Sequence, residues 1–366
     1  MFGQWIGEYT GNSAGTIMID IDDGAGCFEG HAYLNDIDPD MPRMSARFKT
    51  NGKSRREIVP VDNIVLTPGR ISGDELKKKY PDIAFPDGAT VTLEEVKGSL
   101  SVSWVTSIGS LGSALIQRSQ SDRPSNLKAH PKVTSWTKFW QFAVKQDPGR
   151  FLFRGQSRPW RLRTAFHRTR RKDLQKFIHV DIPDLHRVVS AKASYFDLRD
   201  ELHNGAFWHL MQHHGYPTPL LDWTASPFVA AYFAYQSDPA RTAAQKKVRV
   251  LMFDQEQWKR DYYQVKFVAT SQPHVSLIQP LALGNERSLP QQAVSFVTNV
   301  DDIESYIRDR EKQKGKQYLY AFDLPYAERD EALRQLTLMG VTAGALFPGL
   351  DGACEEMRCR HFGFGP

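Results

Sequence analysis

The sequence has few cysteines and no long apolar run. Three cysteines in 366 residues are too few for a fold held together by disulfides. No apolar stretch approaches the roughly 18 residues of a membrane span. Residues 1–11 contain neither the basic region nor the apolar core of a secretion signal. We therefore predict a soluble, cytoplasmic protein without a membrane partner.

Two common chemical signatures are also missing. The loop Gly-x-x-x-x-Gly-Lys-Ser/Thr of P-loop NTPases does not occur. His209 and His213 have the spacing of metal ligands on a helix, but Leu210 stands where the Glu of His-Glu-x-x-His would be, and spacing marks no third ligand. Cys354 and Cys359 have no second cysteine pair with which to hold a zinc ion. We therefore predict no bound metal.

The charge is divided unevenly along the chain. Residues 1–126 contain 13 Lys and Arg against 17 Asp and Glu, whereas residues 127–366 contain 34 against 25. The change falls in a polar stretch without periodicity, which is typical of a linker. We predict a first domain over residues 1–116, a linker over 117–129 and a second domain over 130–366. Their opposite net charges favour mutual attraction.

The first domain has the pattern of an antiparallel β barrel or sandwich. Turn-forming residues occupy positions 22–26, and Lys97 and Gly98 form a tight turn. Trp5 and Tyr9 alternate with glycines over residues 5–11, as in a strand that enters a small barrel or sandwich, and are predicted to lie in the core. The role of this domain is not predicted. Five short apolar runs predict its strands, at 16–21, 28–34, 44–50, 90–96 and 100–106.

The second domain mixes helix and strand signals without regular alternation, which predicts an α+β fold. Ser135 and Ser226 are predicted to cap helices, and Pro227 suits the first helical position. The strands are expected at 150–154, 248–253 and 318–322, and the helices at 135–144, 207–214, from 227 onward and at 328–339.

Four separated motifs occur in this second part. They are Phe-Arg-Gly-Gln at 153–156, the run at 212–227 that continues as Val-Ala-Ala-Tyr-Phe-Ala at 229–234, Asn-Glu-Arg-Ser-Leu-Pro-Gln-Gln at 285–292, and Leu-Phe-Pro-Gly-Leu-Asp-Gly at 346–352. Together they resemble the FRG domain over roughly residues 130–360. The chain departs from that family at Pro219, where Arg is frequent, and near Ala293, where Gly is frequent. The resemblance does not account for residues 1–126.

The same region also resembles a divergent ADP-ribosyltransferase core. That superfamily has a basic residue on its first core strand, which Arg154 matches here. A Ser/Thr motif on a later strand leads into a helix, and Thr224 and Ser226 match it. A Glu or Gln follows on a third strand, for which Gln291 is the candidate and Gln292 the second choice. This resemblance is short, and it implies NAD as the substrate.

These residue types suit NAD chemistry. The planar guanidinium of Arg154 can bind two oxygens of a phosphate group through two parallel hydrogen bonds. Gly155 allows close backbone approach to a ligand, and Gln156 belongs to the same predicted binding segment. The helix that Ser226 opens has free N–H groups that favour anions. Together with Thr224, these residues form the predicted cofactor-binding set.

The catalytic set follows from the bond that breaks. Cleavage of the nicotinamide–ribose bond develops positive charge on the ribose. Gln291 can hydrogen-bond the ribose but cannot act as a base. Asp222 and His213 are therefore the candidates for deprotonating an acceptor. With Arg154 and Gln291 they make up the predicted catalytic set. Each candidate also has a structural interpretation: Arg154 in an ion pair, Asp222 bracing the turn before Ser226, and Gln291 as a surface residue.

A basic run with interleaved aromatic residues follows the first motif. Cations among aromatic rings are typical of a groove for single-stranded nucleic acid, because the cations contact phosphates and the rings stack on bases. The alternatives are a solvated basic face or a site for an acidic inhibitor, such as an antitoxin. The predicted nucleic-acid-binding residues are Arg158, Trp160, Arg161, Arg163, Arg168, Arg170 and Arg171.

The sequence therefore predicts an NAD-dependent ADP-ribosyltransferase that modifies nucleic acid, with RNA favoured. Such an activity harms a cell, which suggests a bacterial toxin or an anti-phage effector. One alternative is a binding module for a nucleotide or nucleic acid that performs no chemistry. Another is a nuclease or hydrolase that uses His213, His214 and Asp222.

Overall fold

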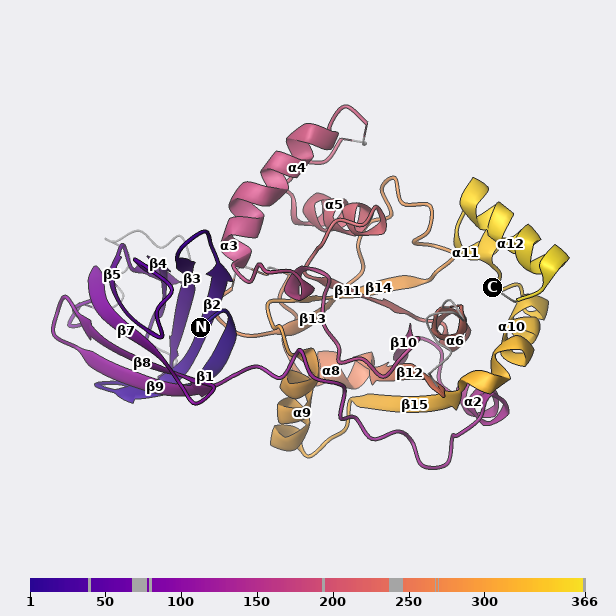
Figure 1. Cartoon of the computed structure of the whole chain (residues 1–366), viewed down its shortest axis with the longest axis horizontal. Coiled ribbons are helices and arrows are strands. Elements are labelled where there is room, and N and C mark those ends of the chain that lie inside the picture. The colour runs from indigo at the N-terminus through magenta and orange to yellow at the C-terminus, as the bar shows by residue number, and fades with distance from the viewer. Residues whose placement is uncertain are drawn as a thin grey trace.

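The N-terminal part of the chain is one antiparallel sheet that curls into a half-barrel (Figure 1). The computed structural model describes residues 1–38, 41–67, 78, 81–192, 195–236, 246–266, 268 and 270–364. The strand order of the sheet is β5-β7-β8-β9-β1-β2-β3-β4-β6. The strands are β1 (Gly3–Gly11), β2 (Gly15–Asp23), β3 (Phe28–Asp36), β4 (Arg43–Lys49), β5 (Arg56–Asp62), β6 (Val65–Thr67), β7 (Gly88–Val96), β8 (Ser99–Thr106) and β9 (Leu111–Gln117).

This sheet confirms the predicted antiparallel β fold, although the sequence patterns missed three strands. Lys97 and Gly98 both have positive φ and join β7 to β8 in the predicted two-residue turn. Trp5 and Tyr9 belong to the predicted apolar core inside the curl. The missed strands are β5, β6 and β9. In β5 exposed residues, including Pro60, alternate with buried ones, and the strand lies at an edge, where proline is tolerated.

The second part contains a six-stranded sheet in which every pair is antiparallel. Its strand order is β13-β14-β11-β10-β12-β15, so β10 lies next to β11 in the middle of the sheet. The helices around it complete the predicted α+β fold. The strands are β10 (Phe151–Gln156), β11 (Leu220–Thr224), β12 (Lys247–Asp254), β13 (Val275–Ile278), β14 (Ala293–Thr298) and β15 (Leu319–Pro325).

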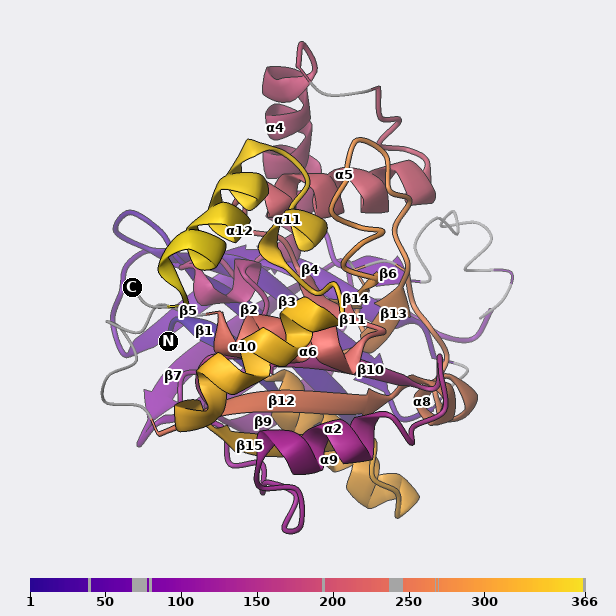
Figure 2. The same ribbon diagram turned by 90° about the vertical axis from the view of Figure 1, so that its right-hand side faces the viewer.

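Helices cover both faces of this sheet. One face packs against α2 (Trp136–Ala143), α6 (Pro227–Tyr235) and α10 (Arg329–Leu338), which are in front in Figure 2. The other face packs against α8 (Gln255–Asp261) and α9 (Ile303–Lys314). No helix of the described residues is long and apolar enough to cross a membrane. The other helical segments are η1 (Phe166–Arg168), α3 (Leu174–Lys176), η2 (Phe177–Asp181), α4 (Ile182–Val189), α5 (Glu201–His213), η3 (Tyr326–Glu328), α11 (Ala343–Leu346) and α12 (Leu350–Phe362).

The predicted helix starts are accurate where a cap marks them. The hydroxyl of Ser135 accepts a hydrogen bond from Lys138 N, and that of Ser226 accepts one from Val229 N at 3.3 Å. The helix predicted from 207 onward begins earlier, at Glu201. Its cap is Asp200, whose carboxylate accepts from two amides of the first turn.

The two parts of the chain meet through complementary charges. Asp22 of β2 accepts a hydrogen bond from Arg171 Nε at 2.9 Å, and Glu29 of β3 accepts one from Lys176 Nζ at 2.9 Å. His31 of β3 contacts Asp173 Oδ1 at 2.9 Å. The acidic first part and the basic second part are therefore joined by several of the groups that create their opposite net charges.

The stretch between the two sheets is also held by polar contacts. Ser121 Oγ donates to Asp301 Oδ2 at 2.7 Å, and Ser125 Oγ donates to Glu304 Oε2 at 2.9 Å. Further along, Ala129 forms an isolated parallel bridge with Ala321 of β15. The chain therefore follows the surface of the second part before entering α2.

Candidate functional site

The central strands of the second sheet separate from each other and leave a cleft. β10 pairs with β12 along its whole length but with β11 at one position, Phe153 opposite Thr224. β11 pairs along its whole length with β14. Beyond Phe153, the continuation of β10 therefore has no ladder partner on that side among the described residues. The cleft that opens there has a volume of about 630 Å³, within the roughly 300–1,000 Å³ typical of ligand pockets.

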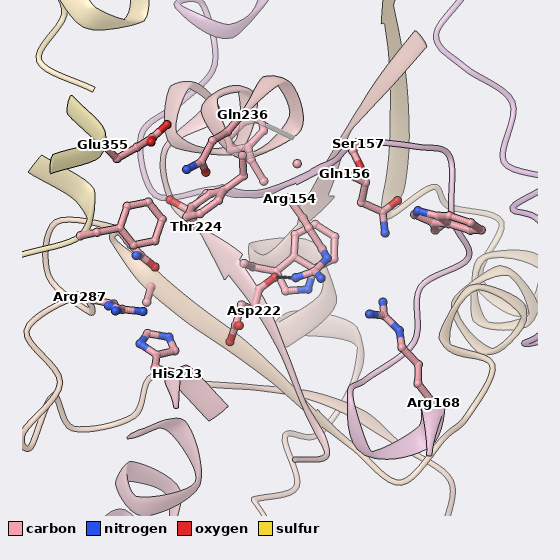
Figure 3. A pocket seen from close by; sticks show the side chains of 18 residues that line it. Arg154, Gln156, Ser157, Arg168, His213, Asp222, Thr224, Gln236, Arg287 and Glu355 are labelled. Atoms are coloured by element: carbon pink, nitrogen blue, oxygen red, sulfur yellow. Dashed lines mark hydrogen bonds between the residues drawn. The ribbon is translucent and has the colours of Figure 1, made fainter. Parts of the chain in front are cut away.

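The cleft collects residues from all four sequence motifs (Figure 3). Several were not predicted, including Arg287, Phe347, Gln236 and Glu355. Arg287 and Phe347 lie within the motifs at 285–292 and 346–352, so the motifs signalled them. Gln236 and Glu355 carried no sequence signal. The lining residues with polar or charged side chains are Arg154, Gln156, Ser157, Trp160, Arg168, His213, Asp222, Trp223, Thr224, Gln236, Arg287, Gln291 and Glu355.

Arg154 is the central cation of this cleft. Its Nη1 donates a hydrogen bond to the main-chain carbonyl of Asp222, a group that full pairing of β10 with β11 would engage. Its Nε is buried and has no hydrogen-bond partner among the described residues. Burial lowers the pKa of Arg154 to about 10, so the guanidinium stays protonated at neutral pH. A buried cationic N–H without an acceptor is costly, and an anionic ligand would satisfy it.

Two more arginines and two carboxylates line the cleft together with Arg154. Arg168 and Arg287 line the cleft, and the Arg287 guanidinium carbon lies 5.5 Å from the centre of the Phe347 ring. Asp222 accepts a hydrogen bond from Ser295 Oγ at 3.3 Å. Glu355 is paired with Arg358, which lowers the pKa of its carboxyl. Three cations against two carboxylates leave the cleft with an excess of positive charge.

The predicted Thr224 and Ser226 have different surroundings. Thr224 lines the cleft, and its hydroxyl accepts a hydrogen bond from Ser226 N at 3.0 Å. Ser226 is not among the lining residues. Its hydroxyl accepts from an amide in the first turn of α6 and so occupies one of the free N–H groups that were predicted to attract an anion.

Gly155 and Gln156 continue β10 into the cleft, and the glycine also has a packing role that was not predicted. A Cβ at Gly155 would lie 1.8 Å from the carbonyl oxygen of Ala230. The glycine therefore lets helix α6 pack directly on β10, a role that requires no ligand. Gln156 is buried, and its Oε1 has no hydrogen-bond partner among the described residues. It offers the cleft an unsatisfied acceptor beside the unsatisfied donor of Arg154.

Gln291 lies in the cleft, in the turn two residues before β14. Its Nε2 donates to the carbonyl of Leu346 at 2.9 Å. Gln292, the second choice, is not among the lining residues. It has a positive φ of 48°, and its carbonyl accepts from Ala225 N at 3.1 Å. The sheet pairing of Thr224 with Ala293 brings this turn beside the end of β11.

Asp222 and His213 also come together. Three possible ligand atoms lie within 4.8 Å of one another: a ring nitrogen of His209, a ring nitrogen of His213 and a carboxylate oxygen of Asp222. Spacing along the chain marked no third ligand beside His209 and His213, and the structure places Asp222 there. His214 is not a lining residue and lies at the exposed end of α5. The predicted trio of His213, His214 and Asp222 is therefore not collected in the cleft.

The basic run divides into two groups. Arg161 binds Asp302, and Arg163 binds Asp301, so both guanidiniums hold the segment that leads into α9. Arg171 joins Asp22 and Asp181, and Arg170 is exposed near Asp23. The members that line the cleft are Arg168 and Trp160, which is 52% exposed. The guanidinium carbon of Arg158 lies 5.7 Å from the centre of the Trp160 ring.

Comparison with protein families finds the FRG domain at residues 149–243. This match spans β10, α5, β11 and α6, and it contains the first two sequence motifs. The motifs at 285–292 and 346–352 lie outside it, although both contribute residues to the same cleft. The chain therefore carries an FRG domain, and its cleft extends beyond the matched segment. No curated protein and no solved structure matches this chain.

Proposed function

We propose that this protein binds NAD in the cleft between β10 and β11 and transfers its ADP-ribosyl group to an acceptor. The observation that carries the proposal is the buried Nε of Arg154, which has no acceptor among the described residues. A pyrophosphate oxygen supplies that acceptor, and an arginine can bind one phosphate group through two parallel hydrogen bonds. Arg168 and Arg287 add positive charge around the same space.

The neighbouring strands support the proposal. Arg154 is on β10, Thr224 is at the end of β11, and Gln291 precedes β14, so the three matched positions follow one another across the sheet. In our proposal Arg154 binds phosphate, Thr224 hydrogen-bonds a ribose, and the free oxygen of the Gln291 amide accepts from a ribose hydroxyl. The volume of about 630 Å³ lies within the range of ligand pockets, which supports a bound small molecule such as NAD.

The chemistry requires stabilisation of positive charge on the ribose as nicotinamide leaves. Gln291 contributes a dipole and no charge. The carboxylates of Asp222 and Glu355 are the anionic groups among the lining residues. We propose that they stabilise the developing cation from the walls of the cleft, because electrostatic stabilisation by fixed groups is strong where water is excluded.

We propose a single-stranded nucleic acid, with RNA favoured, as the acceptor. Trp160 is exposed at the cleft with Arg158 over its ring, which is the arrangement of a base-stacking platform beside a phosphate contact. Arg168 lines the cleft nearby. If about three cations contact phosphates, the salt slope for a single strand is about −2. Modification of RNA would make the protein a toxin or an anti-phage effector.

The test is incubation with NAD labelled in its adenylate portion, together with RNA, single-stranded DNA or lysate protein. We expect label on RNA and release of nicotinamide. Arg154→Ala should abolish both, and Arg260→Ala, an exposed change on α8, should leave both unchanged.

Two results would replace the proposal. NAD binding by calorimetry with neither transfer nor nicotinamide release over hours would indicate a binding module. RNA cleavage that needs no NAD and is lost in His213→Ala would indicate a hydrolase.

A further inference from the structure

One amide side chain connects two histidines beside the cleft. Asn285 Oδ1 lies 2.9 Å from Nδ1 of His213, and Asn285 Nδ2 lies 3.0 Å from Nδ1 of His209. The two rings are one helical turn apart on α5, with centres separated by 4.5 Å. Asn285 and His209 are buried, and His213 lines the cleft.

This geometry gives the two imidazoles opposite tautomers. An amide oxygen only accepts a hydrogen bond and an amide nitrogen only donates one. His213 therefore carries its proton on Nδ1 and donates it to the oxygen of Asn285, which leaves a lone pair on Nε2. His209 accepts at Nδ1 and carries its proton on Nε2. Burial lowers the pKa of His209 to about 4 and moves the pKa of His213 below its usual value, so both rings are neutral at pH 7.

The opposite tautomers argue against a metal ion held by His209, His213 and Asp222. A metal bound at Nε2 of both rings needs a lone pair on each, and hence a proton on each Nδ1. The nitrogen of Asn285 would then face an N–H group of His209, with two donors in contact. The same arrangement suits proton transfer, because the ring that faces the cleft has its Nε2 unprotonated.

We propose that His213 is the base that deprotonates the acceptor. In this proposal Asn285 is a positioning residue: its hydrogen bond to His209 orients the amide, and the amide oxygen then fixes the tautomer of His213. This inference rests on the proposed function. As the acceptor forms a bond to C1′ of the ribose, the C1′–N bond to nicotinamide breaks, and nicotinamide leaves as a neutral molecule with the bonding pair. The acceptor's O–H or N–H proton moves to Nε2 of His213.

The surroundings of His213 suit a group that gains a proton during the reaction. The carboxylate of Asp222 favours the imidazolium, as does the hydrogen bond to Asn285, and Arg287 and His214 oppose it. His209 is the remaining titratable group in contact, and it stays neutral. The transfer rate should therefore be level at neutral pH and fall as pH decreases below the usual histidine range, since His213 must be unprotonated to act.

The first experiment reads the tautomers by ¹⁵N NMR of the full chain without NAD. We expect His213 protonated at Nδ1 and His209 protonated at Nε2. Asn285→Asp presents an acceptor to both rings, so both should become protonated at Nδ1. Equal tautomers in the unmodified protein, or stoichiometric Zn²⁺ binding that His213→Gln removes, would overturn the inference whether or not NAD is consumed.

The second experiment measures transfer. His213→Gln should reduce the transfer rate at least 100-fold with less than a threefold change in NAD affinity, whereas His361→Gln, an exposed change on α12, should leave both unchanged. Asn285→Asp should shift the acidic limb of the pH–rate profile toward higher pH. Transfer that survives His213→Gln with an unchanged pH profile would refute the role of His213. Absence of all NAD turnover would instead refute the proposed function, while the tautomer result would still stand by itself.

Discussion

Arg154 donates a hydrogen bond to the main-chain carbonyl of Asp222 across the gap between β10 and β11. The side chain thereby replaces one ladder bond that the separated strands have lost. The remaining N–H groups of a guanidinium are still available, because it carries five donors. One side chain thus stabilises the open form of the sheet and presents positive charge to the space that the opening creates.

Arg154→Lys tests whether NAD binding needs the planar guanidinium of Arg154 or only its positive charge. Lysine keeps the positive charge but has no planar guanidinium. It can therefore neither bridge the gap to the Asp222 carbonyl nor bind a pyrophosphate with two parallel hydrogen bonds. We expect NAD affinity, measured by calorimetry, to fall at least tenfold, or about 1.4 kcal/mol. Arg260→Lys on α8 serves as the matched control and should bind NAD normally. Equal affinities of the two variants would show that charge alone matters at position 154.

The packing role of Gly155 predicts a change in stability. Gly155→Ala puts a Cβ against the Ala230 carbonyl, so α6 must move away from β10 at a cost of about 1–3 kcal/mol. Gly205, inside α5, has open space around the position of a Cβ, and Gly205→Ala should stabilise the protein by about 1 kcal/mol through helix propensity. Urea unfolding of the two variants should therefore shift in opposite directions. A neutral Gly155→Ala variant would contradict the close packing.

The sequence predicted elements best where local chemistry marks them. Ser135 and Ser226 cap helices as expected, because a cap is a local pattern of one side chain and a few amides. α9 was missed, although Asp302 caps it and Gly315 ends it with positive φ. Its sequence is rich in charged residues, so the apolar face that normally signals a helix is weak.

The residues of the candidate site were predictable only in part, and its geometry was not. The motifs pointed to Arg154, Thr224 and Gln291, which all line one cleft. The separation of β10 from β11 has no sequence signature, because strand pairing depends on contacts between distant segments. For the same reason, the ion pairs of Arg161 and Arg163 could not be predicted. Their partners Asp302 and Asp301 are about 140 positions away, and the run alone could not show that these charges are paired.

A glutamate at position 291 should not speed the proposed transfer. The amide nitrogen of Gln291 donates to the carbonyl of Leu346, and a glutamate would set an oxygen against that oxygen. We expect Gln291→Glu to lose about 1 kcal/mol of stability and to transfer ADP-ribose no faster than the unmodified protein. Thermal unfolding and the labelled-NAD assay measure the two effects. A rise in transfer rate would show that the turn before β14 can rearrange to present the carboxylate.

Asp20, at the junction of the two parts, should make stability depend on pH. Its Oδ1 accepts from Gln4 at 2.8 Å, whereas its Oδ2 is buried with no partner among the described residues. Burial, reinforced by Asp173, Asp22 and Asp301, raises the pKa of Asp20 well above its ordinary value. The folded state therefore prefers the protonated form. This contribution to stability is complete below about pH 4, the ordinary pKa of Asp, and is lost as pH rises through the raised pKa.

Asp20→Asn removes that dependence, because the amide keeps an oxygen for Gln4 and never ionises. We expect the variant to exceed the unmodified protein in unfolding free energy by about 1–3 kcal/mol at pH 8, with a smaller difference at pH 5. Asp23→Asn on the same strand is the matched control. Lys53 lowers the pKa of Asp23, so losing its carboxylate should not stabilise the protein at either pH. Urea unfolding of the three proteins at both pH values measures the differences. An Asp20→Asn variant less stable than the unmodified protein at pH 8 would mean that the buried carboxylate is satisfied by its surroundings.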